Sequence, residues 1–332
     1  MNNLKKIGLT ALAGSMVAVS AANAIEMTAN GKMKITYVDE GEGSAGNTDV
    51  TGNPYGFEQA ISFTASGETP LGTASTYFKH EAGSIGSSYI AIDMGDAGTV
   101  SLDDGYYYAG LITVMDVMPR AAGAEQSWDD VDGTNDTAWD MYNLANHEAN
   151  NAFGYTNSIM GIDITASYEK NGGAGNEDDG NADAGDDSNK SIVISNSSLV
   201  EGLTLGAGYG KFDDPDSEDI QKHSTLYAKY AIGPVVLGYQ TQYVNEDDDD
   251  HESTLYGVSF NVNENISVSY NQRDVEIGDG SNGNTDQENT GIAASYTMGG
   301  MSLSAFNNKV DNVGGTAGTD DEVTQVTLSF SF

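Results

Sequence analysis

Residue types that commonly carry enzymatic chemistry are sparse in this sequence. Its 332 residues include no cysteine and only four histidines. Neither Gly-x-Ser-x-Gly nor His-Glu-x-x-His occurs, so no motif places a nucleophile beside a base or two histidines on one metal ion. The histidines are scattered, at His80, His147, His223 and His251. We therefore expect no enzyme and no required cofactor; a barrel hydrolase with a dispersed Ser–His pair is the alternative, and no specific pattern supports it.

Carboxylates are the abundant chemical group, with 50 acidic residues against 13 basic ones and a formal net charge of −37. Several form runs, at residues 177–179, 183–187 and 246–250. Carboxylate oxygens are hard ligands that suit Ca²⁺, but no run has EF-hand spacing, since the stretch that begins at Asp179 has Ala184 at the glycine position. We expect charged surface loops that bind Ca²⁺ weakly.

One long stretch, residues 106–149, combines acidic with aromatic side chains. A connection of this length is uncommon unless it is functional or disordered. Trp128, Trp139 and Tyr142 favour packing, because disordered segments lack such residues. The alternative is a solvated external loop. The acids of the stretch that we consider further are Asp116, Glu125, Asp129, Asp130, Asp132, Asp136 and Asp140.

The N-terminus has the pattern of an export signal. Lys5 and Lys6 precede an apolar run that is too short to span a membrane as a helix, and Ala22-Asn-Ala24 resembles a cleavage site. We predict a signal peptide over residues 1–24 and one domain over residues 25–332. Loss of two lysines changes the charge from −37 to −39, so the domain as a whole repels nucleic acid and anionic head groups.

Both ends of this domain alternate in polarity. Val326, Leu328, Phe330 and Phe332 are separated by single polar residues, and residues 27–37 alternate in the same way. This period of two is typical of a strand with one apolar and one wet face. Because an uncovered terminal strand would be an aggregation hazard, we expect the last strand to pair with the first.

Between these ends, short turns alternate with long acidic stretches. The turns lie near residues 67–72, 95–98, 160–161, 201–202, 233–234, 263–265 and 299–300. The long stretches are residues 106–149, 171–189, 213–222, 245–252, 278–289 and 311–321. Seven turns join fourteen strands, and the two terminal strands make sixteen. The pattern predicts an all-β, sixteen-stranded antiparallel transmembrane barrel, with blurred alternation at residues 74–81 and 191–199.

Tyrosines separate this interpretation from a soluble β-sandwich. They recur near the ends of the apolar rows, as an aromatic girdle at a membrane interface requires. These are Tyr37, Tyr168, Tyr209, Tyr230, Tyr243, Tyr270 and Tyr296. The opposite face carries Ser, Thr, Gln, Asn and Gly, which suits a water-filled lumen.

The carboxy-terminal Phe332, Gly31-Lys32 and the stretch Gly95-Asp-Ala-Gly-Thr-Val-Ser-Leu102 resemble features of the general diffusion porins of Gram-negative outer membranes. The resemblance covers the whole domain in layout and these pieces in sequence. It departs from the family at Asp103-Asp104, where many porins have Gly-Arg of a basic pore wall.

The resemblance implies several further properties. The third external loop, here residues 106–149, folds into the barrel and narrows it, and Lys32 faces the pore. The barrel-assembly machinery reads the terminal Phe, and Phe330 and Phe332 serve closure. A homotrimer in the outer membrane is implied, although residues 81–87 are short for a loop that latches a neighbour.

We thus expect an outer-membrane pore for small hydrophilic solutes and ions, with a preference for cations. The candidate constriction consists of Asp103, Asp116, Glu125, Asp129, Asp130, Asp132, Asp136 and Asp140. The candidate basic wall consists of Lys32, Lys34, Lys229 and Arg273. The alternatives are a substrate-selective porin and a secreted or surface β-rich adhesin that binds Ca²⁺.

Overall fold

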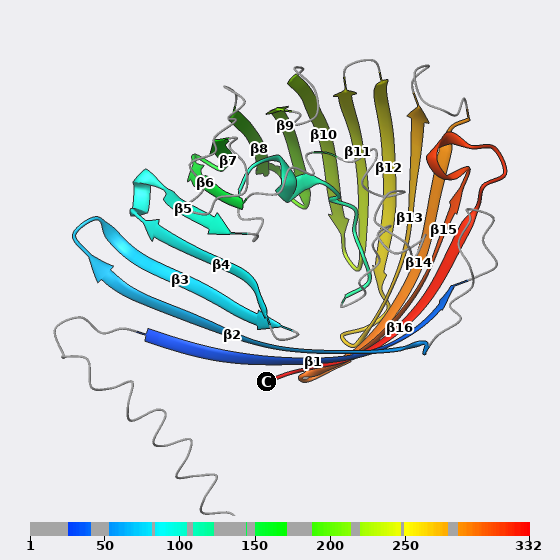
Figure 1. Cartoon of the computed structure of the whole chain (residues 1–332), viewed down its shortest axis with the longest axis horizontal. Coiled ribbons are helices and arrows are strands. Elements are labelled where there is room, and N and C mark those ends of the chain that lie inside the picture. Colours follow the sequence, from blue (N-terminus) through cyan, green and yellow to red (C-terminus); the bar gives the residue numbers. More distant parts are fainter. Residues whose placement is uncertain are drawn as a thin grey trace, which may run out of the picture.

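Sixteen antiparallel strands close into one barrel in the computed structural model, in which each strand pairs with its sequence neighbours and β1 pairs with β16 (Figure 1). The structure describes residues 26–40, 53–81, 84–104, 109–122, 144, 150–170, 188–213, 220–246, 249–277 and 285–332. The strands are β1 (Glu26–Glu40), β2 (Tyr55–Thr69), β3 (Gly72–Glu81), β4 (Ser84–Asp93), β5 (Thr99–Asp104), β6 (Asn150–Ile159), β7 (Ile162–Lys170), β8 (Ser188–Val200), β9 (Leu203–Asp213), β10 (Ile220–Ile232), β11 (Val235–Glu246), β12 (Asp249–Asn261), β13 (Ile266–Ile277), β14 (Gln287–Met298), β15 (Met301–Asp311) and β16 (Asp321–Ser331). The predicted fold class is confirmed.

The seam between β1 and β16 closes the barrel where the sequence predicts it. Ile35 lies opposite Leu328 and Met33 opposite Phe330. Beyond the last strand residue, the amide of Gly31 donates to the carbonyl of Phe332 at 2.6 Å, and the amide of Phe332 donates back at 3.0 Å. The Phe332 ring lies over Gly31, so that a Cβ atom there would approach the ring to 2.3 Å. Glycine therefore lets the terminal ring cover the seam.

Alternating residues face outward and inward along every strand. On β16, Val326 and Phe330 are exposed, whereas Gln325 and Thr327 are buried. All seven tyrosines predicted for the girdle are exposed on the outer face. The buried inward positions are rich in Ser, Thr, Asn and Gln. A lumen that can hold water tolerates such residues, so the distribution fits a membrane barrel.

The short turns lie where the sequence predicts them. At one, Met160 and Gly161 both have positive φ, of 54° and 80°, which suits a two-residue hairpin. The blurred stretches 74–81 and 191–199 lie in β3 and β8, and both strands have register irregularities, between Lys79 and His80 and between Asn196 and Val200. Their weak alternation therefore reflects irregular pairing within the barrel.

One predicted loop, at residues 245–252, is wrong. β11 continues to Glu246 and β12 begins at Asp249, so both strands run through most of the acidic stretch. One of these carboxylates has partners on the outer face: Tyr243 donates to Asp250 at 2.5 Å, and the Asn245 amide also donates to Asp250. The pairing of β11 with β12 therefore continues into a stretch whose acidic residues had predicted a loop.

Residues 109–122 form a layer inside the barrel. They begin with the 3-10 helix η2 (Leu111–Val114), which lies within the ring of strands (Figure 1). The other short helices, η1 (Gly95–Ala97) and η3 (Val313–Gly315), lie in connections. No helix in the described part of the chain is both long enough and apolar enough to cross a membrane.

Candidate permeation site

The segment 109–122, which we call the inner segment, lies along the inner wall and is held there by side chains of the strands. At its start, the amide of Gly110 donates to Thr165 of β7 at 2.9 Å, and the amide of Leu111 donates to Ser191 of β8 at 2.7 Å. Backbone amides inside a barrel need such acceptors, because an unpaired buried amide is costly. The inward hydroxyls of β7 and β8 supply them.

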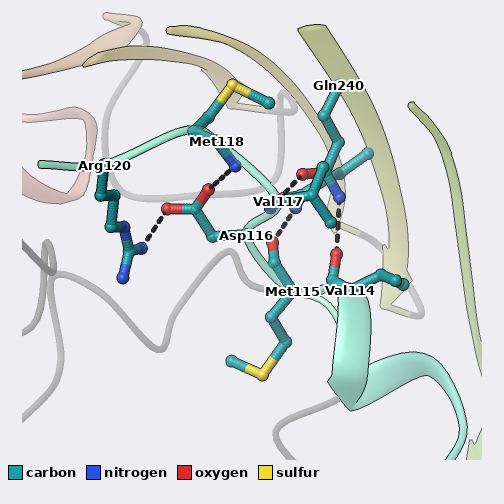
Figure 2. A network of polar contacts seen from close by, with 8 residues as sticks. Val114, Met115, Asp116, Val117, Met118, Arg120 and Gln240 are labelled. Carbon is teal, nitrogen blue, oxygen red and sulfur yellow. Dashed lines mark hydrogen bonds and ion pairs between the residues drawn. The ribbon is translucent and has the colours of Figure 1, made fainter. Parts of the chain in front are cut away.

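Two glutamines of β11 hold the middle of the inner segment. Gln240 accepts from the amide of Val117 at 3.1 Å and donates to the carbonyl of Val114 at 2.6 Å, as Figure 2 shows. Gln242, two residues further along the same face, donates to the carbonyl of Met115. Both amide groups thus replace the strand partners that the segment lacks.

The far end of the inner segment is anchored on β13. The amide of Ala121 donates to Ser269 at 3.0 Å, and the amide of Ala122 donates to Ser267 at 2.7 Å. Ala121 also packs in an apolar cluster with Phe306 and Val323, from β15 and β16. Fourteen consecutive residues therefore reach from the β7 side of the wall to the β13–β16 side.

Inward glycines make room for this segment. A Cβ atom on Gly208 would approach Leu111 to 2.4 Å, and one on Gly238 would approach Pro119 to 2.5 Å. Both glycines are in mid-strand, where glycine weakens a sheet and often marks a close approach of another chain segment. Gly208 of β9 and Gly238 of β11 are therefore small because the inner segment packs against them, which the sequence analysis, by grouping Gly with the polar residues of the wet face, did not predict.

The inner segment carries one compensated charge pair. Asp116 accepts from the Met118 amide at 2.7 Å and from the Arg120 guanidinium at 2.5 Å (Figure 2). The Asp116 side chain is only 6% exposed, whereas that of Arg120 is 31% exposed. Arg273, on the inner face of β13, is buried and donates to Ser253 at 3.1 Å. The Asp116 carboxylate therefore accepts its hydrogen bonds from within the segment and is largely shielded from solvent.

The wall formed by β1–β4 has a different chemistry. Lys32 and Lys34 face inward on β1, and both lie near Glu58 of β2, at 4.0 and 3.4 Å. On β3, Lys79 pairs with Glu81. Further along this inner face, the rings of Tyr77 and Tyr89 stack with centroids 5.6 Å apart. Charged pairs and aromatic rings thus line the part of the wall that the inner segment leaves uncovered.

Comparison with known proteins identifies the family of this chain. A sequence-family model described as Gram-negative porin matches residues 8–332. The chain belongs to the Gram-negative porins. No curated protein sequence matches it. Membership of this family and the closed barrel make the chain an outer-membrane channel for passive diffusion, a class of protein that does not act as an enzyme.

Solved porin structures share the fold at low identity. Salmonella typhi OmpF in complex with daunomycin is 13% identical with a TM-score of 0.68, over 92% of this chain and 97% of that one. An anion-selective porin from Comamonas acidovorans is 15% identical with a TM-score of 0.66, over 93% of this chain and 100% of that one. The DcaP channel of Acinetobacter baumannii is 12% identical with a TM-score of 0.58, over 95% and 99%. At these identities the likeness establishes the fold alone.

The predicted site residues of this porin fall into three groups. Asp116, in the inner segment, and the four basic candidates Lys32, Lys34, Lys229 and Arg273 are all on the inward side. Asp103 is in β5, and nothing is described of its side chain. Glu125, Asp129, Asp130, Asp132, Asp136 and Asp140 lie outside the described residues, as does the predicted signal peptide.

The structure adds carboxylates that sequence reasoning missed. A cavity of about 590 Å³ lies between the inner segment and the short-turn end of the porin barrel. Its wall includes Asp93, Asp96 and Asp163 together with hydroxyl groups of Thr99, Thr113 and Thr156, and none of the described residues lining it is Lys or Arg. Alternation along β4 and β7 could have placed Asp93 and Asp163 inward, but only the course of the segment brings them to one space.

No metal centre is visible in the part of the porin that the structure describes, where no three His, Cys, Asp or Glu side chains come together as metal ligands would. The acidic runs 177–179 and 183–187 lie outside the described residues. Of the run 246–250, Asp250 lies on the outer face of β12 and accepts from Tyr243 and Asn245. Weak Ca²⁺ binding by these loops therefore stays a prediction.

Proposed function

We propose that this outer-membrane channel prefers cations and passes small hydrophilic solutes. The observation that carries the proposal is the cavity below the inner segment, where Asp93, Asp96 and Asp163 line the space without a basic residue among the described lining. A solute that leaves the channel towards the short-turn end meets these carboxylates. Their hydroxyl neighbours offer donors and acceptors to a hydrated or hydroxyl-bearing solute.

Four of the basic groups on the inner face lie near acids, which offset part of their charge. Lys32 and Lys34 lie beside Glu58, Lys79 lies beside Glu81, and Arg120 lies beside Asp116. Residues 123–143 would add six more carboxylates without any Lys or Arg. We propose that the acids that narrow the pore and make it prefer cations are Asp103 and this group, namely Glu125, Asp129, Asp130, Asp132, Asp136 and Asp140.

The expected size of the effect follows from Coulomb's law. A unit charge at 4 Å from a passing ion is worth about 1 kcal/mol in water-like surroundings and about 4 kcal/mol at an effective dielectric of 20. The smaller figure already separates cations from anions severalfold. Salt screens charges over about 8 Å at physiological ionic strength, so the preference should weaken as salt rises.

The test is the reversal potential of single channels in planar bilayers under a KCl gradient. Wild type should show cation preference at low salt, and a variant with Asp129, Asp130 and Asp132 changed to Asn should show less. A control with Asp183, Asp186 and Asp187 changed to Asn removes the same charge from a predicted external loop. Anion preference of the wild type would overturn the proposal, and equal behaviour of both variants would remove residues 123–143 from the constriction.

We also propose a homotrimer, because the family to which the chain belongs forms trimers. The connection between β3 and β4 is short, so the contact would depend on the barrel walls rather than on a long latch. Recognition of Phe332 by the assembly machinery and removal of residues 1–24 complete the proposal. Native mass spectrometry in detergent reports the oligomer and the mass of the mature chain together.

A further inference from the structure

A cavity of about 430 Å³ lies in the inner wall formed by β1, β2 and β3, near the short-turn end of the barrel. Its volume is in the range of sites that hold small molecules, roughly 300–1,000 Å³. No Asp or Glu side chain in the described part of the chain lines it, and at its edge the terminal carboxylate of Phe332 accepts from the Gly31 amide at 2.6 Å. The polar inward residues of this cavity, which we call the β1–β3 cavity, are Asn30, Lys32, Ser62, Tyr77, Lys79 and Ser331.

Strand pairing brings these residues together and leaves room between them. Ser62 of β2 lies directly opposite Asn30 of β1 on one side and Lys79 of β3 on the other. Ala60 is two positions away on the same face of β2, directly opposite Lys32. Because Ala60 and Ser62 are short, the wall is hollow between the longer side chains of the two neighbouring strands.

An aromatic ring forms one side of the cavity. Tyr77 of β3 stacks on Tyr89 of β4, with ring centroids 5.6 Å apart and an angle of 13° between the ring planes. Tyr77 lines the cavity and Tyr89 does not. Tyr89 therefore supports Tyr77 from the β4 side, and the side of Tyr77 towards β2 borders the cavity. A ring held in this way is a preformed platform for another ring.

Two ammonium groups give the cavity a positive lining. Lys32 reaches it from β1 and Lys79 from β3. The Lys32 side chain is 43% exposed and lies 4.0 Å from Glu58, and Lys79 pairs with Glu81. Neither glutamate lines the cavity. An anion inside the cavity would therefore meet the lysines on one side and leave their acidic neighbours on the other. The cavity below the inner segment is the opposite case, since its described lining has three aspartates and no lysine.

We propose that the β1–β3 cavity binds a monosaccharide that carries a carboxylate, such as a hexuronate, as this solute passes through the pore. The C–H bonds on one side of the sugar ring lie over Tyr77, because the face of an aromatic ring is negative. The carboxylate accepts from Lys32 and Lys79, and the hydroxyl groups pair with Asn30 and Ser62. A plain hydrocarbon ring would desolvate those two polar groups without replacing their hydrogen bonds, so the lining favours a hydroxylated ring.

The proposal rests on the passage of hydrophilic solutes proposed above, but not on the preference for cations. Carboxylates elsewhere in the lumen favour cations, whereas this cavity offers an anionic solute one local site of the opposite charge. Reversal potentials in a KCl gradient report the ion preference of the pore, and interruption of the current by an added sugar reports occupancy of the cavity. The two proposals can therefore fail separately.

The test measures how added solutes interrupt single-channel KCl currents of the full-length porin in planar bilayers. Galacturonate should block at a lower concentration than galactose, which lacks the charge, acetate, which lacks the ring, or benzoate, which lacks the hydroxyl groups. Tyr77→Leu should raise the half-blocking concentration of galacturonate by about threefold to tenfold, through loss of the aromatic face. The double variant K32Q/K79Q should raise it by about tenfold, through loss of both charge-assisted contacts.

Matched controls lie on the outer face. Tyr230→Leu and K190Q/K309Q remove the same groups from outward positions, and galacturonate should block both as it blocks wild type. Ser62→Val fills the cavity without changing its charge or its aromatic ring. It should leave the KCl conductance nearly unchanged while raising the half-blocking concentration of galacturonate, and it decides the question if the Tyr77 variant does not fold.

Four outcomes would overturn the proposal. Wild-type channels that galacturonate does not block would have no such site. Equal block by galacturonate and acetate would assign the lysines to small anions in general, and stronger block by benzoate would assign the cavity to aromatic acids. Unchanged block of the Tyr77, lysine and Ser62 variants would place the bound sugar elsewhere in the lumen.

Discussion

Two walls of the same barrel differ in what they face. The wall from β7 to β13 carries Ser, Thr, Gln and Gly, and these residues hold the inner segment by hydrogen bonds and close contacts. The wall of β1–β4 carries Lys34, Glu58, Lys79 and stacked tyrosines, and the inner segment does not cover these residues. Neutral hydrogen-bonding groups thus predominate where another chain segment must pack, with the buried Arg273 of β13 as an exception, whereas the charges of β1–β4 are partly exposed.

The difference follows from the cost of burial. A charged side chain beneath the inner segment would lose its hydration, whereas a hydroxyl or an amide recovers its hydrogen bond from the segment backbone. Gln240 shows this directly, because both ends of its amide are used by Val114 and Val117. The wall from β7 to β13 therefore gains a second layer, whereas β1–β4 are held together by strand pairing, ion pairs and stacked rings within the part of the chain that the structure describes.

The largest effect should come from the uncovered wall, at its seam. Deleting Phe332 removes the ring over Gly31 and two terminal hydrogen bonds, and should lower the amount of folded barrel in the outer membrane severalfold. Heat-modifiable mobility on gels measures folded barrel. Phe260→Ala removes an outward ring from β12 as a control. Unchanged folded protein after the deletion would show that closure does not depend on this ring.

The second effect should come from the covered wall. Gly238→Val places atoms where Pro119 now packs, and overpacking of this kind costs about 1–3 kcal/mol. We expect the inner segment to shift, with altered single-channel conductance and more frequent current fluctuations. Ser62→Val, on the uncovered inner face beside a cavity of about 430 Å³, is the control and should leave conductance nearly unchanged. Equal effects of the two substitutions on conductance would contradict the claim that only the wall from β7 to β13 supports the inner segment.

The smallest effect should come from the charges of the uncovered wall. Changing Lys32 and Lys34 to Gln leaves Glu58 without its basic neighbours on β1, and should raise cation preference by about twofold, since both groups are partly solvated and screened. Reversal potentials in a KCl gradient measure the change, and Lys309→Gln on the outer face is the control. A shift towards anions would mean that Glu58 does not act on the permeant ion.

Much of the fold could be predicted from local pattern. The period of two in residues 326–332 gave the faces of β16, and turn residues such as Met160-Gly161 marked hairpins, because both signals depend only on neighbours in the chain. Local charge misled at residues 245–252, where β11 and β12 stay paired and Asp250 has partners on the outer face. Residues 74–81 show the opposite limit, since a register shift blurred the alternation of a real strand.

By itself, then, the sequence determined the number of strands, the inward and outward faces of the regularly alternating strands, the closing seam and the excess of carboxylates. Only the tertiary structure decided which inward residues meet the inner segment, that Asp116 is compensated by Arg120, and that Lys32, Ser62 and Tyr77 line one cavity. The physical reason is range: alternation is set by adjacent residues, whereas register and the path of a segment across the lumen depend on contacts between residues as far apart in sequence as Val117 and Gln240.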